Sequence, residues 1–310
     1  MGLYVSDSKQ YLKKSKWIFS IMLFAEDQLT TLQNIVRVTS LIGFSGAILV
    51  FVYLIRFPRL FNNPVGRIVI ALACTDAIDA SFKFLARAGI NSGSDSALCQ
   101  IQAFVLHVEC QAQLLLGLSL GLNIVYILYL KGDAQTIQKY EWGIIFLSFS
   151  IPLPYAVYQL FNPHLVGDGD LWCFTSAEYG NLRFWTFYFW LILIFMLNVL
   201  FIILTSIGIR RLYQNLRNLG ASESSSKGIK VVLYRLAIYL IGFFIAWLPS
   251  FLNRTIPHPH ANYEFAMAQA IVSPTRGMIN FLAFWLSMRK SEEVVVDETT
   301  STSQKGLPYS

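Results

Sequence analysis

Residues 184–209 read FWTFYFWLILIFMLNVLFIILTSIGI, and these 26 residues carry no charge between Arg183 and Arg210. An α-helix rises about 1.5 Å per residue and the hydrocarbon core of a bilayer is about 30 Å thick, so about 20 apolar residues cross it. This stretch therefore predicts a transmembrane helix.

Six other stretches complete the pattern. Four are uncharged, with 18, 21, 22 and 18 residues, and lie between Arg37 and Arg56, Glu109 and Lys131, Glu141 and His164, and Arg235 and Arg254. Two more, at 67–87 and 265–288, are apolar but contain charged residues. The sequence thus predicts an all-α, integral membrane bundle of seven transmembrane helices, expected at about 33–55, 66–88, 99–130, 141–161, 183–209, 230–252 and 264–286.

The composition agrees with this class. Hydrophobic residues make up 55% and charged residues 14% of the 310 residues, and the mean hydropathy is +0.51. Soluble domains carry about 25% charged residues. The net charge of +6 comes from short basic runs between apolar stretches, which is typical of membrane topology and not of a nucleic-acid-binding surface.

Basic residues gather in the loops on one predicted side of the membrane. They are Arg56, Arg59, Arg67, Lys131, Lys139, Arg210, Arg211, Arg217, Lys227, Lys230, Arg289 and Lys290. The loops of the other side hold Arg87, Arg183 and Arg254. Because cytoplasmic loops carry the excess of Lys and Arg, we expect the N-terminus outside and the C-terminus inside, in a multi-pass protein of the plasma membrane.

The predicted domain organisation has three parts: an extracellular N-terminal segment at 1–32, a seven-helix transmembrane domain at 33–288 and a disordered cytoplasmic tail at 289–310. Within the first part, the apolar run 17–25 fits a signal peptide or a short interfacial helix, and its shortness favours the helix. The tail offers candidate phosphorylation sites to kinases and arrestin-like partners, although a plain solvated tail fits equally. These sites are Ser291, Thr299, Thr300, Ser301, Thr302 and Ser303.

Polar side chains line one face of three predicted helices. Spacings of three and four residues put side chains on one side of a helix. Charges inside a membrane usually face the bundle interior, where they find partners. The stripes are Asp76, Asp79, Lys83 and Arg87; Gln102, Glu109 and Gln113; and Gln269, Ser273, Arg276 and Asn280. We expect an inward-facing polar network built on Asp76, Asp79, Arg276 and Asn280.

These stripes leave two interpretations open. In the first, a polar cavity binds an extracellular ligand, for which a small anionic molecule is a candidate. The ligand-binding residues would be Lys83, Arg87, Gln102, Glu109, Arg183 and Arg254. In the second, the charges pair internally, for example Asp79 with Lys83 and Asp76 or Glu109 with Arg276, and only hold the bundle together.

Two prolines fall inside predicted helices, in Trp247-Leu248-Pro249 and Ser273-Pro274. Proline removes a backbone donor and bends a helix, so Trp247, Pro249 and Pro274 are candidate hinge residues, with a static kink as the alternative. The basic residues of the loop between the fifth and sixth helices are candidate contacts with a G protein. The excess of basic residues expected on the cytoplasmic side of any membrane protein explains them equally well. The basic residues of this loop are Arg210, Arg211, Arg217, Lys227 and Lys230.

The four cysteines lack the spacing of a CxxC site. Cys99 and Cys173 are both expected to face the oxidising compartment, where a bond between them would hold the second outer loop over the bundle. Cys74 and Cys110 fall inside helices and are expected to be buried thiols. No metal site and no cofactor are expected.

Several short stretches are informative in combination. They are CQIQAF at 99–104, RIVI at 67–70 before Asp76, IPL at 151–153, LWCF at 171–174, LRF at 182–184, Asn253-Arg254, Gly277 and Asn280. Together they resemble the slime-mould cyclic AMP receptor family and its relatives in other eukaryotes, over about residues 35–288. The resemblance implies a G-protein-coupled receptor that activates a heterotrimeric G protein, and it carries over a Cys99–Cys173 disulfide. The ligand does not follow, since members beyond slime moulds need not bind cyclic AMP.

Other classes fit less well. The third helix ends at 126–131 without the acidic-Arg-aromatic triplet of rhodopsin-like receptors, and 265–288 holds no lysine for retinal. A metal hydrolase needs converging ligands, but three of the four histidines fall in outer loops. A membrane transporter or channel remains the alternative, because intramembrane charges also mark substrate paths. Against it stand continuous helices and the lack of an inverted repeat, so we predict a receptor and not an enzyme.

Overall fold

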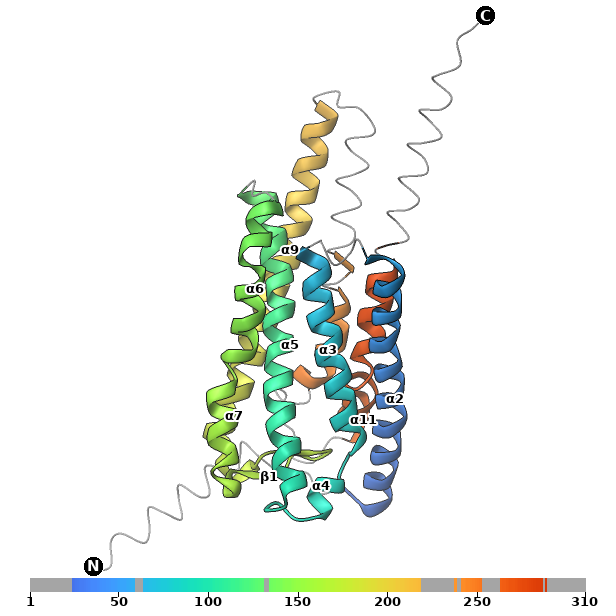
Figure 1. The fold of residues 1–310 in the computed structure, drawn as a ribbon, viewed down its shortest axis with the longest axis vertical. Helices are drawn as coiled ribbons and strands as arrows, with labels where there is room; N and C mark the ends of the chain where they lie inside the picture. Colours follow the sequence, from blue (N-terminus) through green and yellow to red (C-terminus); the bar gives the residue numbers. More distant parts are fainter. Residues whose placement is uncertain are drawn as a thin grey trace, which may run out of the picture.

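The computed structural model describes residues 24–58, 64–130, 134–218, 237–238, 241–252, 263–286 and 288. Its long helices run side by side along one axis (Figure 1). Four of them are long and apolar enough to cross a membrane: Glu26–Arg56, Ala97–Tyr129, Thr136–Leu160 and Gly180–Arg211. Ile241–Leu252 is a shorter apolar helix.

The described residues trace seven passes through the bundle. They are α2 (Glu26–Arg56); α3 (Pro64–Phe84); α5 (Ala97–Tyr129); α6 (Ala134–Ser150) with α7 (Leu153–Leu160); α8 (Gly180–Arg183), η4 (Phe184–Tyr188) and α9 (Phe189–Asn218); the helix at 241–252; and α11 (Tyr263–Val272) with the helix at 276–286. The predicted seven-helix membrane bundle is confirmed.

The first pass begins at Glu26, earlier than the predicted start near 33. The side-chain Oε1 of Gln28 accepts the N–H of Ala25 at 3.2 Å, which satisfies one of the free donors at the helix start. Glu26 and Asp27 lie in the first turn, where negative charge interacts favourably with the helix dipole. Local capping therefore extends this helix into polar sequence.

Two passes are interrupted near prolines. The fourth crosses as one span, Thr136–Leu160, with a two-residue turn at Ile151 and Pro152 between α6 and α7; Pro152 cannot donate a backbone hydrogen bond. The seventh is divided at 273–275, next to Pro274. There the Thr275 hydroxyl donates to the carbonyl oxygens of Ile271 (3.1 Å) and Val272 (3.0 Å). By contrast, the helix at 241–252 continues through Pro249.

A small hairpin closes one end of the bundle. Strands β1 (Val166–Asp168) and β2 (Cys173–Thr175) pair antiparallel and lie beside α4 (Ala88–Asn91) at the lower end of Figure 1. We call residues 166–175 the lid. The Cys99–Cys173 disulfide, with 5.3 Å between the Cα atoms, ties the lid to the start of α5 and confirms the predicted pairing.

Close backbone contact joins the first pass to the seventh. A Cβ on Gly46 would overlap the backbone of Met278, and one on Gly43 would overlap the carbonyl of Pro274. Nearer the lid in the same interface, the Thr39 hydroxyl donates to the carbonyl of Ala270 at 2.9 Å. Small residues permit such close approach of helices in a membrane.

This contact predicts opposite effects for two glycine-to-alanine substitutions. Gly46→Ala should lower the thermal unfolding temperature of the purified protein, because overpacking costs about 1–3 kcal/mol. Gly143→Ala should leave it unchanged or raise it, since a Cβ there meets no atom within 4 Å and alanine favours a helix by about 0.5–1 kcal/mol. Equal unfolding temperatures for both variants would contradict the close packing.

Candidate functional site

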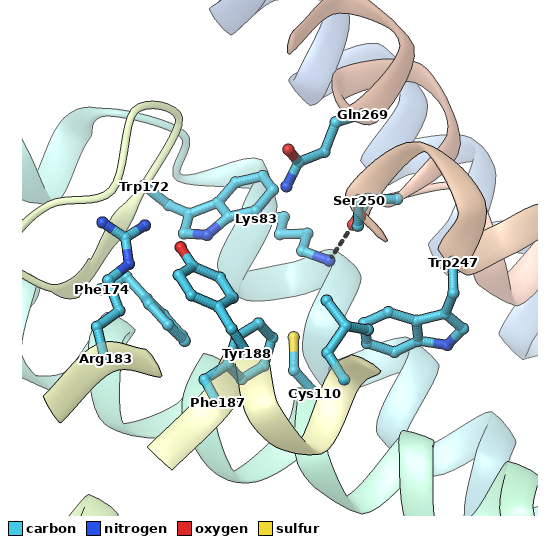
Figure 2. Close-up of a pocket in the computed structure, with 12 residues that line it drawn as sticks. Lys83, Cys110, Trp172, Phe174, Arg183, Phe187, Tyr188, Trp247, Ser250 and Gln269 are labelled. Atoms are coloured by element: carbon cyan, nitrogen blue, oxygen red, sulfur yellow. Dashed lines mark hydrogen bonds between the residues drawn. The ribbon is translucent and has the colours of Figure 1, made fainter. Parts of the chain in front are cut away.

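A cavity of about 40 Å³ lies beneath the lid, with room for a few water molecules. Figure 2 shows Lys83 in the middle of the cavity, with the guanidinium of Arg183 to one side, beside Phe174 and Tyr188. The lid contributes Trp172 and Phe174. The other lining residues are Lys83, Cys110, Arg183, Phe187, Tyr188, Leu191, Trp247, Ser250, Gln269 and Ser273.

The two cysteines outside the disulfide differ in burial. Cys110 is buried, as expected. Cys74 is exposed, so the expectation that it is a buried thiol is wrong.

The wall formed by the fifth pass depends on a π-helical turn at Phe184–Tyr188. A π turn inserts one extra residue into a helix, so the side chains after it are rotated relative to those before it. Here Phe187 and Tyr188 are both buried, and both line the cavity together with Arg183. The amide of Gln111 on α5 donates to the carbonyl of Thr186 inside the turn.

Arg183 is a buried cation of this cavity whose charge has no partner among the described residues. Its side chain is 3% exposed, and within the described part of the chain it makes no hydrogen bond or ion pair. Its guanidinium carbon lies 5.7 Å from the ring centre of Phe174 and 5.4 Å from that of Tyr188. Burying an unpaired charge is costly, so this site favours an anionic partner.

A cluster of buried ionisable side chains forms the floor of the cavity and continues deeper into the bundle. We define the charge cluster as Asp76, Asp79, Lys83, Glu109 and Arg276, which are 1–3% exposed. Asp79 lies 2.7 Å from Lys83 Nζ and 2.6 Å from Arg276 Nη2. Lys83 also donates to the hydroxyl of Ser273 at 2.8 Å. The predicted internal pairing of Asp79 with Lys83 is confirmed.

Amide side chains hold the deepest carboxylate. Asp76 accepts from Gln113 Nε2 at 2.9 Å and from Asn280 Nδ2 at 2.6 Å. Arg276 donates through Nε to the carbonyl of Ser273 at 3.0 Å, which satisfies backbone at the interruption of the seventh pass. The polar stripes of the second, third and seventh passes therefore meet in the interior, as predicted.

Trp247 separates the cavity from a second, deeper one of about 20 Å³ and lines both. The guanidinium carbon of Arg276 lies 4.5 Å from the centre of the Trp247 ring. Gln113 and Asn280 also line the deeper cavity. Trp247 thus contacts both the space under the lid and the charge cluster.

Three predicted ligand residues do not line the cavity beneath the lid. Gln102 donates to the carbonyls of Phe82 (3.0 Å) and Ala86 (3.1 Å) and accepts from the N–H of Cys173 (3.0 Å), so it joins α3, α5 and the lid. Arg87 pairs with Asp168 of the lid at 2.6 Å. Glu109 lies in the charge cluster, 3.8 Å from Arg276.

Other predicted residues lie at the far end of the bundle or beyond the described residues. Arg210 and Arg211 are exposed on α9, which projects past its neighbours at the upper end of Figure 1. Arg217 belongs to the same helix. Outside the described residues lie Arg254, Lys227, Lys230, Ser291, Thr299, Thr300, Ser301, Thr302 and Ser303.

The aromatic walls of the cavity were not predicted from the sequence. They are formed by Trp172, Phe174, Phe187 and Tyr188. Aromatic residues are common throughout this chain, so their composition carries no signal for a binding site. The useful signal was the position of Trp172 and Phe174 on either side of Cys173. A disulfide that ties the loop over the bundle places its neighbours above the interior.

Asp79, Glu109 and Cys110 bring potential metal ligands within 4.8 Å of one another. However, Lys83 and Arg276 already supply positive charge to Asp79 at hydrogen-bond distance. A cation placed there would be repelled by both side chains. The cluster is therefore better suited to internal ion pairs than to a metal ion.

The chain is thus a seven-helix membrane bundle, with a disulfide-tied lid over a small cavity and buried charges beneath it. Residues 22–284 match the family model described as slime mold cyclic AMP receptor, and the chain belongs to this family. It is 22% identical over 272 residues to cyclic AMP receptor-like protein A of Dictyostelium discoideum, covering 85% of this chain and 66% of that protein. The family predicted from the short stretches is confirmed.

The fold is similar to that of squid rhodopsin, with a TM-score of 0.64, 12% identity and 94% of each chain covered. The matching family is described as one of receptors, and this supports the receptor interpretation over an enzyme or a transporter. Family and fold also agree with the predicted multi-pass location in a membrane.

The ion pairs of Asp79 predict a large effect of its neutralisation. Asp79→Asn leaves Lys83 and Arg276 buried with one counter-charge fewer, and breaking a buried pair in this way costs about 3–5 kcal/mol. The thermal unfolding temperature of the purified protein should fall markedly. Asp95→Asn, at an exposed loop position, should leave it unchanged; similar unfolding temperatures for the two variants would contradict the structural role of the cluster.

Proposed function

We propose that this chain is a G-protein-coupled receptor whose extracellular ligand carries a negative charge. The observation that carries the proposal is Arg183, a buried guanidinium without an ion pair in the described structure, in the wall of a cavity beneath the lid. A guanidinium can hold a phosphate or carboxylate through two parallel hydrogen bonds. Lys83, 5.0 Å from the ring centre of Trp172, adds positive charge to the floor.

The lid end is proposed to face the outside, with the N-terminus outside and the C-terminus inside. The Cys99–Cys173 disulfide supports this orientation, because disulfides persist in oxidising compartments. Arg210 and Arg211 at the opposite end agree with the excess of basic residues on the cytoplasmic side. In this orientation the lid lies between the cavity and the extracellular solution.

A cyclic nucleotide is the first ligand to test. The family description and the Dictyostelium relative are both named for cyclic AMP, although this chain spans only 66% of that relative. Arg183 would meet the phosphate, and Trp172, Phe174 and Tyr188 offer aromatic faces to a base. A nucleotide exceeds the cavity of about 40 Å³, so its entry requires the lid to move.

The proposed output is a contact with a heterotrimeric G protein at the far end of the bundle. Arg210 and Arg211 would contribute, with Arg217, Lys227 and Lys230 as further predicted contacts. A ligand that binds one packing of the bundle more tightly shifts the population towards it. Trp247, Pro249 and Pro274 remain the predicted hinge residues, and the tail remains a predicted substrate for kinases and a site for arrestin-like partners.

The test is dissociation of G-protein subunits, followed by energy transfer in cells that express the chain at their surface. Cyclic AMP, cyclic GMP, other nucleotides, amino acids and sugars would be applied outside. We expect a response to an anionic compound, with the half-maximal concentration raised about 10- to 100-fold by Arg183→Gln, because a charged hydrogen bond contributes about 1.5–3 kcal/mol.

Lys139→Gln is the matched control, since it removes one charge from an exposed position on α6. It should leave the half-maximal concentration unchanged. A normal response of Arg183→Gln at normal surface expression would overturn the ligand site. Silence of the parent protein across all compounds and several G proteins would overturn the proposed coupling to an anionic ligand.

A further inference from the structure

Glu109 differs from the other carboxylates of the charge cluster in having no hydrogen-bond donor. Both of its carboxyl oxygens are buried, and neither has a hydrogen-bond partner. Its nearest cation is Arg276, whose Nη2 lies 3.8 Å from Oε2. That separation is too long for a hydrogen bond.

The remaining members of the cluster already balance one another. Asp79 takes the two short contacts from Lys83 and Arg276, and Asp76 takes two amide donors. Two acids therefore match two bases. An ionised Glu109 would add a third negative charge, with one of its oxygens within 4.8 Å of an oxygen of Asp79 and of the Cys110 sulfur.

Desolvation decides which form of Glu109 the bundle accepts. Transfer of a carboxylate from water into a protein interior costs several kcal/mol even after relaxation, and only close donors offset that cost. Glu109 has none, and repulsion from Asp79 raises the cost further. Protonation removes the charge and leaves a hydroxyl that can donate to a neighbouring acceptor.

We propose that Glu109 is a proton-binding site inside the bundle, occupied in the described conformation and emptied when Arg276 moves to pair with it. The second half of this proposal rests on an unused donor. Nη1 of Arg276 is buried without a hydrogen-bond acceptor, although Glu109 has unused acceptor oxygens nearby. The cluster therefore contains a donor and an acceptor that a small displacement would bring together.

The position of Arg276 in the chain makes such a displacement possible. Arg276 is the first residue of the helix that resumes after the turn at 273–275, where Pro274 interrupts regular hydrogen bonding. A shift of this helix relative to α11 would carry the guanidinium with it. Pairing with Arg276 would then favour the carboxylate, and the proton of Glu109 would leave to solvent.

The groups that face Glu109 come from three passes. Asp79 and Lys83 lie on α3, Cys110 is its neighbour on α5, and Arg276 lies on the seventh pass. The negative charge of Asp79 disfavours the loss of the proton, whereas the positive charges of Lys83 and Arg276 favour it. Because Lys83 and Arg276 are both engaged by Asp79, the position of Arg276 is the variable that sets proton occupancy.

Infrared spectroscopy of the purified full-length protein tests the site directly, without any ligand or G protein. A protonated carboxyl group has a C=O stretching band distinct from that of a carboxylate, and this band shifts in D₂O. We expect the band at neutral pH in the parent protein and its loss in Glu109→Gln. Glu141→Gln is the matched control: Glu141 is also fully buried, but it is ion-paired with Arg67, so the band should persist.

Absence of the band from the parent protein, or its persistence in Glu109→Gln, would overturn the proton site. If Glu109→Gln fails to fold, Glu109→Asp supplies the same test, because its carboxyl band should appear at a shifted frequency; an unshifted band would again overturn the assignment. These outcomes leave the proposed receptor function untouched, so the two proposals fail independently.

Trp247 offers a measurement of the coupling to Arg276, because the two side chains are stacked. We expect raising the pH to remove the infrared band and to change the tryptophan fluorescence together. The fluorescence change should be lost in Trp247→Phe and in Glu109→Gln. At every pH, the fluorescence of Glu109→Gln should equal that of the parent protein at acidic pH. A pH-dependent change that survives in Glu109→Gln would overturn the coupling.

Discussion

The ion pairs of Asp79 with Lys83 and Arg276 determine how the interior of this bundle is arranged. Charges buried in a membrane protein usually pair with one another or with backbone carbonyls. The Asp79 carboxylate collects one cation from its own helix and one from the seventh pass. The second and seventh passes must therefore lie close together at this depth.

The same cations connect the cluster to its surroundings in both directions. Lys83 reaches the cavity floor and lies near the ring of Trp172 in the lid. Arg276 stacks on Trp247, which lines the deeper cavity as well. The lid is thus connected to the centre of the bundle by a short series of side-chain contacts. The groups in this series are held in place by ion pairs.

The passes and the polar stripes could be predicted from the sequence because both reflect strong energetic penalties. A charge in lipid is costly, so uncharged stretches of about 20 residues mark helices, and the exceptions at Asp76, Asp79 and Arg276 mark the interior. The break near Pro274 followed from the missing backbone donor. The same reasoning does not hold at Pro249, because the helix at 241–252 continues through this proline without interruption.

Features that depend on distances between segments could not be predicted. Gln102 looked like a ligand residue, yet its amide is used by backbone groups of α3 and the lid, which no spacing reveals. Arg87 is paired with Asp168, 81 residues further along the chain. The π turn at Phe184–Tyr188 could not be predicted from the sequence either. Its buried aromatic residues, Phe187 and Tyr188, are of the same type as the exposed Trp185 within the same turn, which is 61% exposed.

The length of α9 has a mechanical consequence. With 30 residues it measures about 45 Å, and Figure 1 shows it projecting beyond the other helices at the end opposite the lid. It is also the direct continuation of the π turn that carries Phe187 and Tyr188. A tilt of about 5° at that turn would sweep the far tip through about 4 Å, so α9 is a lever arm that magnifies sub-ångström repacking beside the cavity.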